Sequence, residues 1–246
     1  MKRFYTEVSV AFADPLEEVA PAKRAATGHG DAWRVLLDSR PIKTPKRAVL
    51  SLPNMTLAEA VAEEWRVQAD IIKPRTMPLT KLANAAIDRV VAHRPDIAEK
   101  IVSYANDQLC YRAAAPEELV ERQNAAWDPL LDWAAERFGA RLATCAGLRH
   151  IAQPVDAVAA LRAAVARYDP FVLAGLHNAV TILGSLVLGL ALAEGRLDAE
   201  TAFALSQLDE LYQAENWGND PEANARARAL AAELAAAARF MTLARA

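Results

Sequence analysis

The sequence has few of the residues that bind metals: its 246 residues include two cysteines and four histidines. It contains neither Cys-x-x-Cys nor His-Glu-x-x-His, the spacings that bring zinc ligands together. No histidine lies three or four residues from another; the histidines are His29, His93, His150 and His177. We therefore expect no metal site.

Motifs for nucleotide binding and covalent catalysis are also missing. The sequence has no Gly-x-x-x-x-Gly-Lys-Ser/Thr phosphate loop and no Gly-x-Ser-x-Gly nucleophile turn. The short Gly28-His29-Gly30 is not a dinucleotide fingerprint, because no helical pattern follows it. Cys110 and Cys145 could pair, but one pair in a chain of this length is more typical of two reduced thiols. We expect no cofactor.

Positive charge is not in excess. Lysine and arginine number 28 against 31 aspartates and glutamates, which gives a net charge of -3 and a pI near 5.9. Nucleic-acid-binding proteins normally present a basic face, because lysine and arginine displace counterions from phosphates. The composition therefore argues against a nucleic-acid partner.

One segment, residues 170–193, lacks aspartate, glutamate, lysine and arginine altogether. About 20 apolar residues are enough to span a bilayer, but this segment contains His177, Asn178, Thr181 and Ser185. Acidic rather than basic residues flank it. We interpret it as the central buried helix of a soluble bundle, not as a membrane span. The N-terminal residues lack the apolar core of a secretory signal, so we expect a cytoplasmic protein.

The sequence does contain two kinds of periodicity, first that of a sheet and then that of helices. Val8, Val10 and Phe12 alternate with polar or small residues, and further short apolar runs separated by turn residues follow at 33–38, 42–45 and 48–52. Residues 14–31, between these runs, are typical of a surface loop. After Pro53 the apolar spacing becomes helical. We predict an α+β fold, with a small β-rich N-terminal domain of antiparallel strands (1–78) and a larger all-α helical C-terminal domain (79–246).

Several short patterns predict where helices begin and end. Thr56-x-x-Glu59 has the spacing of a capping box. Asp128-Pro129 is typical of a cap followed by a first-turn proline, and Gly139 is suited to a helix end. A single helix is predicted over residues 198–215.

The densest polar and aromatic segment is 205–218. On a helix, Asp209 lies one turn from Tyr212 and Gln213, while Glu210 lies one turn from Gln213 and Ala214. Two carboxylates could divide acid and base roles. The segment could equally be a binding surface or an ordinary solvated helix face, and its residues alone leave these alternatives open.

A series of segments along nearly the whole chain resembles one known family. The segments are Trp33-x-Val35-x-Leu37-Asp38-x-Arg40-Pro41-x-Lys43-Thr44-Pro45, Ala60-Val61-Ala62-x-Glu64-Trp65-x-x-Gln68, Thr76-Met77-Pro78-Leu79-Thr80 with Asn84 and Asp88, Cys110-Tyr111-Arg112, Trp127-Asp128-Pro129, and Leu205-Ser206-x-Leu208-Asp209-Glu210-x-Tyr212-Gln213-x-Glu215-x-Trp217-Gly218. In this order they resemble the assembly chaperones of the F-type ATP synthase catalytic head that bind the free alpha subunit. Two positions depart from the family: Ser39 replaces a common glycine, and Ala214 replaces a larger aliphatic residue.

The resemblance implies a chaperone without catalytic residues, found in the bacterial cytoplasm or, in eukaryotic relatives, in the mitochondrial matrix. It would bind the unassembled alpha subunit and shield its subunit interface until beta replaces it, and it would be monomeric when unbound. The implied client-binding residues are Glu210, Asp209, Glu215, Gln213 and Trp217. We expect Trp65, Trp127 and Asp128 to have structural or folding roles.

The residues themselves leave two alternative functions open. The first is a small-molecule enzyme or ligand carrier, with a pocket between helices near His177 and the acidic cluster. It would predict a deep, polar-lined cavity and a titrating group with a shifted pKa. The second is a general holdase, which would bind many unfolded proteins and not one client.

Overall fold

The computed structural model describes residues 1–13, 32–147, 150–218 and 220–246, so the predicted loop at 14–31 lies outside the described residues. The chain forms two compact units. The first comprises Met1–Ile97, Asp169–Gly175 and Arg239–Ala246, and the second comprises Ala98–Tyr168 and Leu176–Ala238. The domain boundary predicted at residue 78 divides the chain into two contiguous domains, and it stays a prediction.

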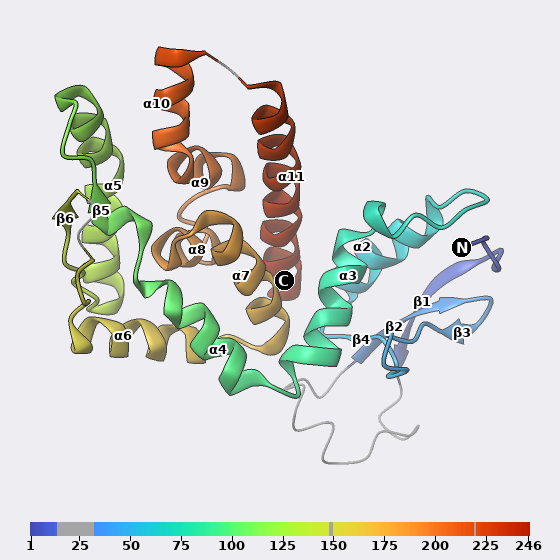
Figure 1. Ribbon diagram of the computed structural model, residues 1–246. Coiled ribbons are helices and arrows are strands. Elements are labelled where there is room, and N and C mark those ends of the chain that lie inside the picture. The colour runs from blue at the N-terminus through green and yellow to red at the C-terminus, as the bar shows by residue number, and fades with distance from the viewer. Residues whose placement is uncertain (14–31, 148–149, 219) are drawn as a thin grey trace. The chain divides into compact units, whose positions relative to one another are not determined.

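A small antiparallel sheet opens the first unit (Figure 1). Its strands are β1 (Val8–Ala13), β2 (Ala32–Leu37), β3 (Arg40–Pro41) and β4 (Ser51–Leu52). Strand β2 pairs with each of the other three, and Val10 lies opposite Val35. Val35 and Leu37 are buried on one face, because side chains alternate along a strand. The small antiparallel β part and the many helices described below confirm the predicted α+β fold class.

The turn between β2 and β3 is made by residues with positive φ. Asp38 and Ser39 have φ angles of 46° and 64°, a conformation that glycine adopts with least strain. The Asp38 carboxylate accepts hydrogen bonds from the backbone N–H groups of Thr6 and Glu7, and these bonds lower the pKa of Asp38. Ser39 therefore makes the tight turn in a strained conformation.

Helix α2 (Met55–Arg66) packs Leu57, Ala58, Val61 and Ala62 into the core of the first unit. The predicted capping box at Thr56 is wrong. The N-cap is Asn54, whose Oδ1 accepts a hydrogen bond of 2.8 Å from the Leu57 N–H. The helix therefore begins before Thr56, because asparagine satisfies a free N–H of the first turn as well as threonine does.

Two polar side chains of the α2 region organise the segment that follows it. The Glu64 carboxylate accepts hydrogen bonds from the backbone N–H groups of Leu79 and Thr80, at 2.7 and 2.8 Å, in the first turn of α3 (Pro78–Ala85). Buried Gln68 accepts a hydrogen bond from the Lys73 N–H and donates to Thr76 Oγ1. The short helices of Pro74–Thr76 and Ala86–Val90 flank α3, and α4 (Arg94–Val102) follows.

The second unit is almost entirely helical (Figure 1). Its short strands β5 (Tyr111–Arg112) and β6 (Cys145–Ala146) pair in parallel. After α4, which ends in this unit, the helices that lie wholly or largely in it are α5 (Glu117–Phe138), α6 (Val155–Ala166), α7 (Pro170–Leu183), α8 (Leu186–Ala193), α9 (Ala199–Ser206), α10 (Leu208–Trp217) and α11 (Pro221–Ala244). Within the described residues, no helix combines the length and the hydropathy needed to cross a membrane.

The uncharged segment was predicted as one helix, and this is wrong, because it breaks between α7 and α8. Gly184 has a φ of 62°, and a β-carbon on it would lie 2.7 Å from Gln108 Oε1. Ser185 Oγ then accepts a hydrogen bond from the Leu188 N–H and caps α8. Most of this segment is buried, as predicted, including every residue of α8, but Thr181 of α7 is exposed.

Helix α5 is continuous where the sequence predicted that a new helix begins. It continues through Pro129, so Asp128-Pro129 is not a helix start. An internal proline costs a helix one hydrogen bond, but the tertiary contacts of the neighbouring Trp127 and Asp128, described below, hold the helix here. Gly139 closes α5 with a φ of 75°, as predicted. The helix predicted over 198–215 is divided at Gln207 into α9 and α10.

We predict that Glu64→Ala lowers the free energy of unfolding by about 2 kcal/mol, because it leaves two N–H groups of the first turn of α3 without their acceptor. Urea denaturation followed by circular dichroism measures this. The matched control is Glu63→Ala, which removes only a surface ion pair with Arg66 and should change stability by less than about 0.5 kcal/mol. Equal effects of the two variants would contradict this role of Glu64.

Candidate functional site

The candidate site is built on helix α10, whose polar residues divide between two faces. Asp209 and Tyr212 contact side chains of α5, whereas Glu210, Gln213 and Trp217 line a groove on another side of α10. The acidic cluster read from the sequence is thus not one surface.

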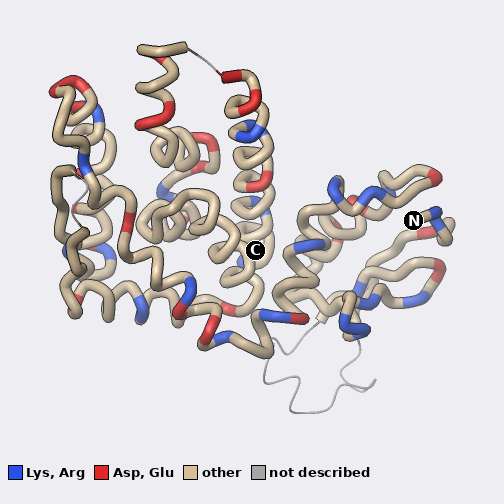
Figure 2. The backbone as a smooth tube through the Cα atoms, viewed as in Figure 1, with Lys and Arg blue, Asp and Glu red and all other residues tan. Residues whose placement is uncertain are grey.

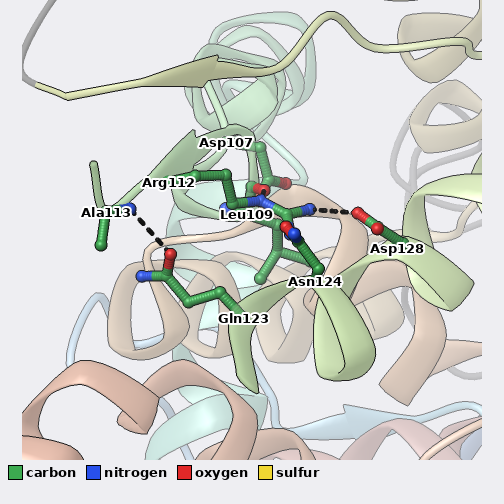
Figure 3. Close-up of polar contacts among 7 residues, drawn as sticks. All are labelled: Asp107, Leu109, Arg112, Ala113, Gln123, Asn124 and Asp128. Carbon is green, nitrogen blue, oxygen red and sulfur yellow. Dashed lines mark hydrogen bonds and ion pairs between the residues drawn. The ribbon is translucent and has the colours of Figure 1, made fainter. Parts of the chain in front are cut away.

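Asp209 contacts a buried side chain of α5. Gln123 is 1% exposed, and its Nε2 donates a hydrogen bond of 2.7 Å to Asp209 Oδ1. The Oε1 of the same amide accepts a hydrogen bond of 2.7 Å from the Ala113 N–H (Figure 3). Both ends of a buried amide need partners, so Gln123 fixes the start of α10 against α5.

Glu215 is held by the same helix, α5. Arg122 Nη1 donates to Glu215 Oε2 at 2.6 Å, and Arg122 Nη2 donates to Glu118. The guanidinium also lies 5.3 Å from the centre of the Tyr212 ring, within the range of a cation–π contact. Because Tyr212 is the buried residue of α10, Arg122 and Tyr212 together set the position of this helix on α5.

A buried arginine in the segment before α5 binds side chains of that helix. Arg112 is 7% exposed, and Figure 3 shows its guanidinium directed at Asn124 and Asp128. Its nitrogens donate to Leu109 O at 2.8 Å, to Asn124 Oδ1 at 3.0 Å and to Asp128 Oδ1 at 2.8 Å. The guanidinium also lies 5.3 Å from the centre of the Trp127 ring. A buried charge is stable only when it is paired in this way.

Asp107 is the most deeply buried carboxylate of the described residues, with an exposure of 0%. It accepts hydrogen bonds from the Val187 N–H at 2.8 Å and the Leu109 N–H at 3.1 Å. Burial raises the pKa of Asp107 to about 6, although its hydrogen bonds act in the opposite direction. Asp107 therefore joins the start of α8 to the segment that carries Arg112.

The other face of α10 borders an open groove of about 810 Å³, with α9 and α10 on one side and α11 on the other. Glu210, Gln213 and Trp217 line it. Trp217 is 78% exposed and the neighbouring Leu211 is 50% exposed, which is unusual for large apolar side chains. Across the described part of the chain, the Glu210 side chain has no ion pair or hydrogen bond. These side chains are therefore free to contact another molecule.

The other residues predicted from the sequence have separate positions. Trp127 is buried, and its Nε1 donates to Leu205 O at 3.0 Å, while Asp128 pairs with Arg112. Trp65 belongs to the first unit, where its ring packs against Tyr5 and its carbonyl oxygen accepts a hydrogen bond from the Tyr5 hydroxyl. His177 does not line the groove.

The predicted set of site residues omits Arg112 and Gln123, the side chains that hold α5 and α10 in place. Arg112 is part of the Cys110-Tyr111-Arg112 segment, but arginine is normally exposed, so its burial has no sequence signal. Gln123 falls on the buried face of α5, and a break in the apolar pattern of that face is the signal that could have revealed it.

Cys110 and Cys145 are free thiols, and burial raises the pKa of Cys110 to about 12. Such a thiol is a poor nucleophile, because the thiolate is the reactive form. The described residues include no group of three histidine, cysteine, aspartate or glutamate side chains placed to hold a metal ion. The main feature of the site is therefore the groove, which is open, walled by helices and lined by exposed apolar groups. Such surfaces are typical of proteins that bind other proteins.

Comparisons with known proteins agree that the chain is of the class that binds other proteins. The model of the ATP12 chaperone protein family matches residues 2–135. The mitochondrial protein atp12 of Schizosaccharomyces pombe is 24% identical over 203 residues, which cover 77% of this chain and 70% of the relative. The crystal structure of Atp12 from Paracoccus denitrificans is 42% identical, with a TM-score of 0.90, over 99% of this chain and 98% of that one. A protein of Agrobacterium tumefaciens matches with 37% identity and a TM-score of 0.88, over 98% of this chain and 85% of that one.

The chain belongs to the ATP12 chaperone family, the chaperones of ATP synthase assembly. The predicted membership in this family is confirmed.

We predict that Asp107 makes stability depend on pH between about 4 and 6. Its folded pKa of about 6 lies above the unfolded value of about 3.9, so the folded state holds the proton more tightly. The contribution of Asp107 to the unfolding free energy is therefore largest below about pH 4. It falls by up to about 3 kcal/mol as the pH rises to about 6 and is then constant.

Asp107→Asn removes this titration, so the stability difference between parent and variant should change across the same pH window. Urea denaturation at about pH 4.5, 5.5 and 7 measures it. Asp132→Asn, at an exposed position of α5, is the control and should follow the parent profile. Parallel profiles for the parent and Asp107→Asn would contradict the assignment.

Proposed function

We propose that this protein binds the unassembled alpha subunit of the F-type ATP synthase and shields its subunit interface until beta replaces it. Family membership supports the general role in assembly. The choice of client rests on the resemblance of the segments described above. The observation that carries the proposed binding site is the exposure of Trp217 and Leu211 beside Glu210, whose side chain has no partner among the described residues, on a helix that α5 holds in position.

Within the proposed site, the five predicted residues would act in two ways. Glu210, Gln213 and Trp217 line the groove and would contact the client directly. Asp209 and Glu215 are engaged by Gln123 and Arg122, so they would contribute by keeping α10 in place. An exposed tryptophan is a frequent centre of binding energy in protein interfaces, and we therefore expect Trp217 to contribute most.

The proposed mechanism needs no turnover and no cofactor. A subunit interface that is exposed before assembly promotes aggregation. A protein that covers it shifts the equilibrium toward the soluble subunit by mass action. Release follows when beta offers a larger and better matched surface. We propose that the free chaperone is monomeric and acts where the catalytic head is assembled, in the bacterial cytoplasm or the mitochondrial matrix.

The small-molecule alternative draws support from the groove volume of about 810 Å³, which lies within the range of ligand pockets. The charged residues that line the groove are Glu200, Glu210, Asp220 and Arg226, and its floor and walls are largely apolar. A groove with such a lining can bind a protein surface at least as well as it can bind a polar metabolite. The capture experiment below distinguishes the two functions.

We predict that co-expression with the alpha subunit of the same organism keeps alpha soluble, and that affinity capture of this chain recovers alpha but not beta. Glu210→Lys and Trp217→Ala should each reduce capture at least tenfold, because each removes an exposed contact and neither residue is buried. The matched control is Glu136→Lys, a charge reversal at an exposed position of α5 outside the groove. It should capture alpha like the parent.

Circular dichroism must show the same fold for all variants. Failure to recover alpha would reject the proposed client. Equal recovery of beta or of an unrelated aggregation-prone protein would favour a general holdase. Retention of a small molecule by the purified chain, without capture of alpha, would favour the ligand-carrier alternative.

A further inference from the structure

The groove on the second unit has a lining that identifies the kind of segment it can accept. Its apolar walls include Phe203 of α9, Leu211 and Trp217 of α10, and Leu230 of α11. Along α11 the groove is also lined by Ala223, Ala227, Ala231 and Ala235, which repeat at intervals of four and therefore share one face. Ala227 and Ala231 are half-buried, and the outer two are exposed. Small side chains on this face let another backbone approach closely.

The secondary structure around the groove limits how a partner can bind. Every wall is an α-helix, whose internal backbone N–H and C=O groups are already paired. No strand borders the groove, so an extended segment has no edge to which it could add. A helix that packs into an apolar groove binds through side chains alone, because its own backbone groups are already paired. From Ala223 to Ala235 the alanine face spans about 18 Å, at 1.5 Å per residue, which is three to four turns of a helix.

The charges of the groove define the polar side of that helix. Glu200, Glu210 and Asp220 line it together with a single cation, Arg226. Figure 2 shows acidic residues on α9, on α10 and in the first turns of α11. A partner with lysine or arginine beside its apolar stripe matches this excess of negative charge, whereas an acidic partner would be repelled.

We propose that the groove binds an amphipathic α-helix of three to four turns, with an apolar stripe and flanking lysine or arginine residues. This inference rests on the proposed function, because it places the helix within the alpha subunit. The apolar stripe packs against Trp217, Leu211 and the alanine face of α11. The basic residues lie opposite Glu210 and Glu200.

The test places a photoreactive benzophenone side chain at Ala227, in the groove, within the full chain bound to the alpha subunit. The same side chain at Ala229 is the matched control, since this residue is exposed on α11 outside the groove. Mass spectrometry then identifies the cross-linked segment of alpha. The expected result is one helical segment with the described pattern, found at Ala227 and not at Ala229.

A synthetic peptide of the cross-linked segment should then compete with alpha for this chain. A version with its lysines and arginines changed to glutamate should compete about tenfold more weakly, because attractions with the acidic residues become repulsions. Raising the salt concentration should narrow that difference, since salt screens charges at exposed sites.

The outcomes separate the inference from the proposed function. If alpha is captured but Ala227 cross-links to a strand, a loop or an acidic helix, the proposed function stands and the helix-in-groove inference fails. The inference also fails if the charge-reversed peptide competes as well as the native one. If alpha is not captured at all, both fail.

Discussion

The buried guanidinium of Arg112 is the constraint on which the arrangement of the candidate site depends. A permanent charge removed from water needs partners in every direction, and Leu109, Asn124 and Asp128 supply them at 2.8 to 3.0 Å. Because two of these partners belong to α5, the position of α5 follows from the position of Arg112. Gln123 and Arg122 of α5 then fix the position of α10 through their hydrogen bonds to Asp209 and Glu215. These contacts hold one side of α10 against α5, and Glu210, Gln213 and Trp217 on its other side line the groove.

Many residues that carry the family resemblance interact with one another. Thr44 Oγ1 donates to Asp88 Oδ1 at 2.6 Å, Glu64 accepts from the backbone of Leu79 and Thr80, and the Trp127 indole donates to Leu205 O. Each of these contacts joins two separate motif segments. The motifs therefore describe mainly the scaffold, and the residues open to a partner, among them Glu210 and Trp217, are a small part of them.

The wrong helix boundaries have a common cause. A single helix was predicted through residues 170–193, but Gly184 makes a left-handed turn against Gln108. A helix start was predicted at Asp128-Pro129, but α5 runs through it, because Trp127 and Asp128 are held by Leu205 and Arg112. Asn54 caps α2 in place of Thr56, and its Nδ2 is itself held by a hydrogen bond of 2.8 Å to the distant Leu243 O. Local propensity amounts to about 1 kcal/mol at such positions, and tertiary contacts can exceed it.

Periodicity, composition and the order of the motif segments were enough to determine the α+β class, the antiparallel strands, the burial of most of residues 170–193 and the family. These properties follow from which residues are apolar and how they are spaced, and both can be read along the chain. The sequence also indicated segment 205–218 as the segment that contains the client-binding residues. Only the tertiary structure divided Asp209 and Glu215 from Glu210, Gln213 and Trp217. That division depends on α5 and α11, whose contacts with α10 come from residues distant in sequence and were not encoded in any local pattern.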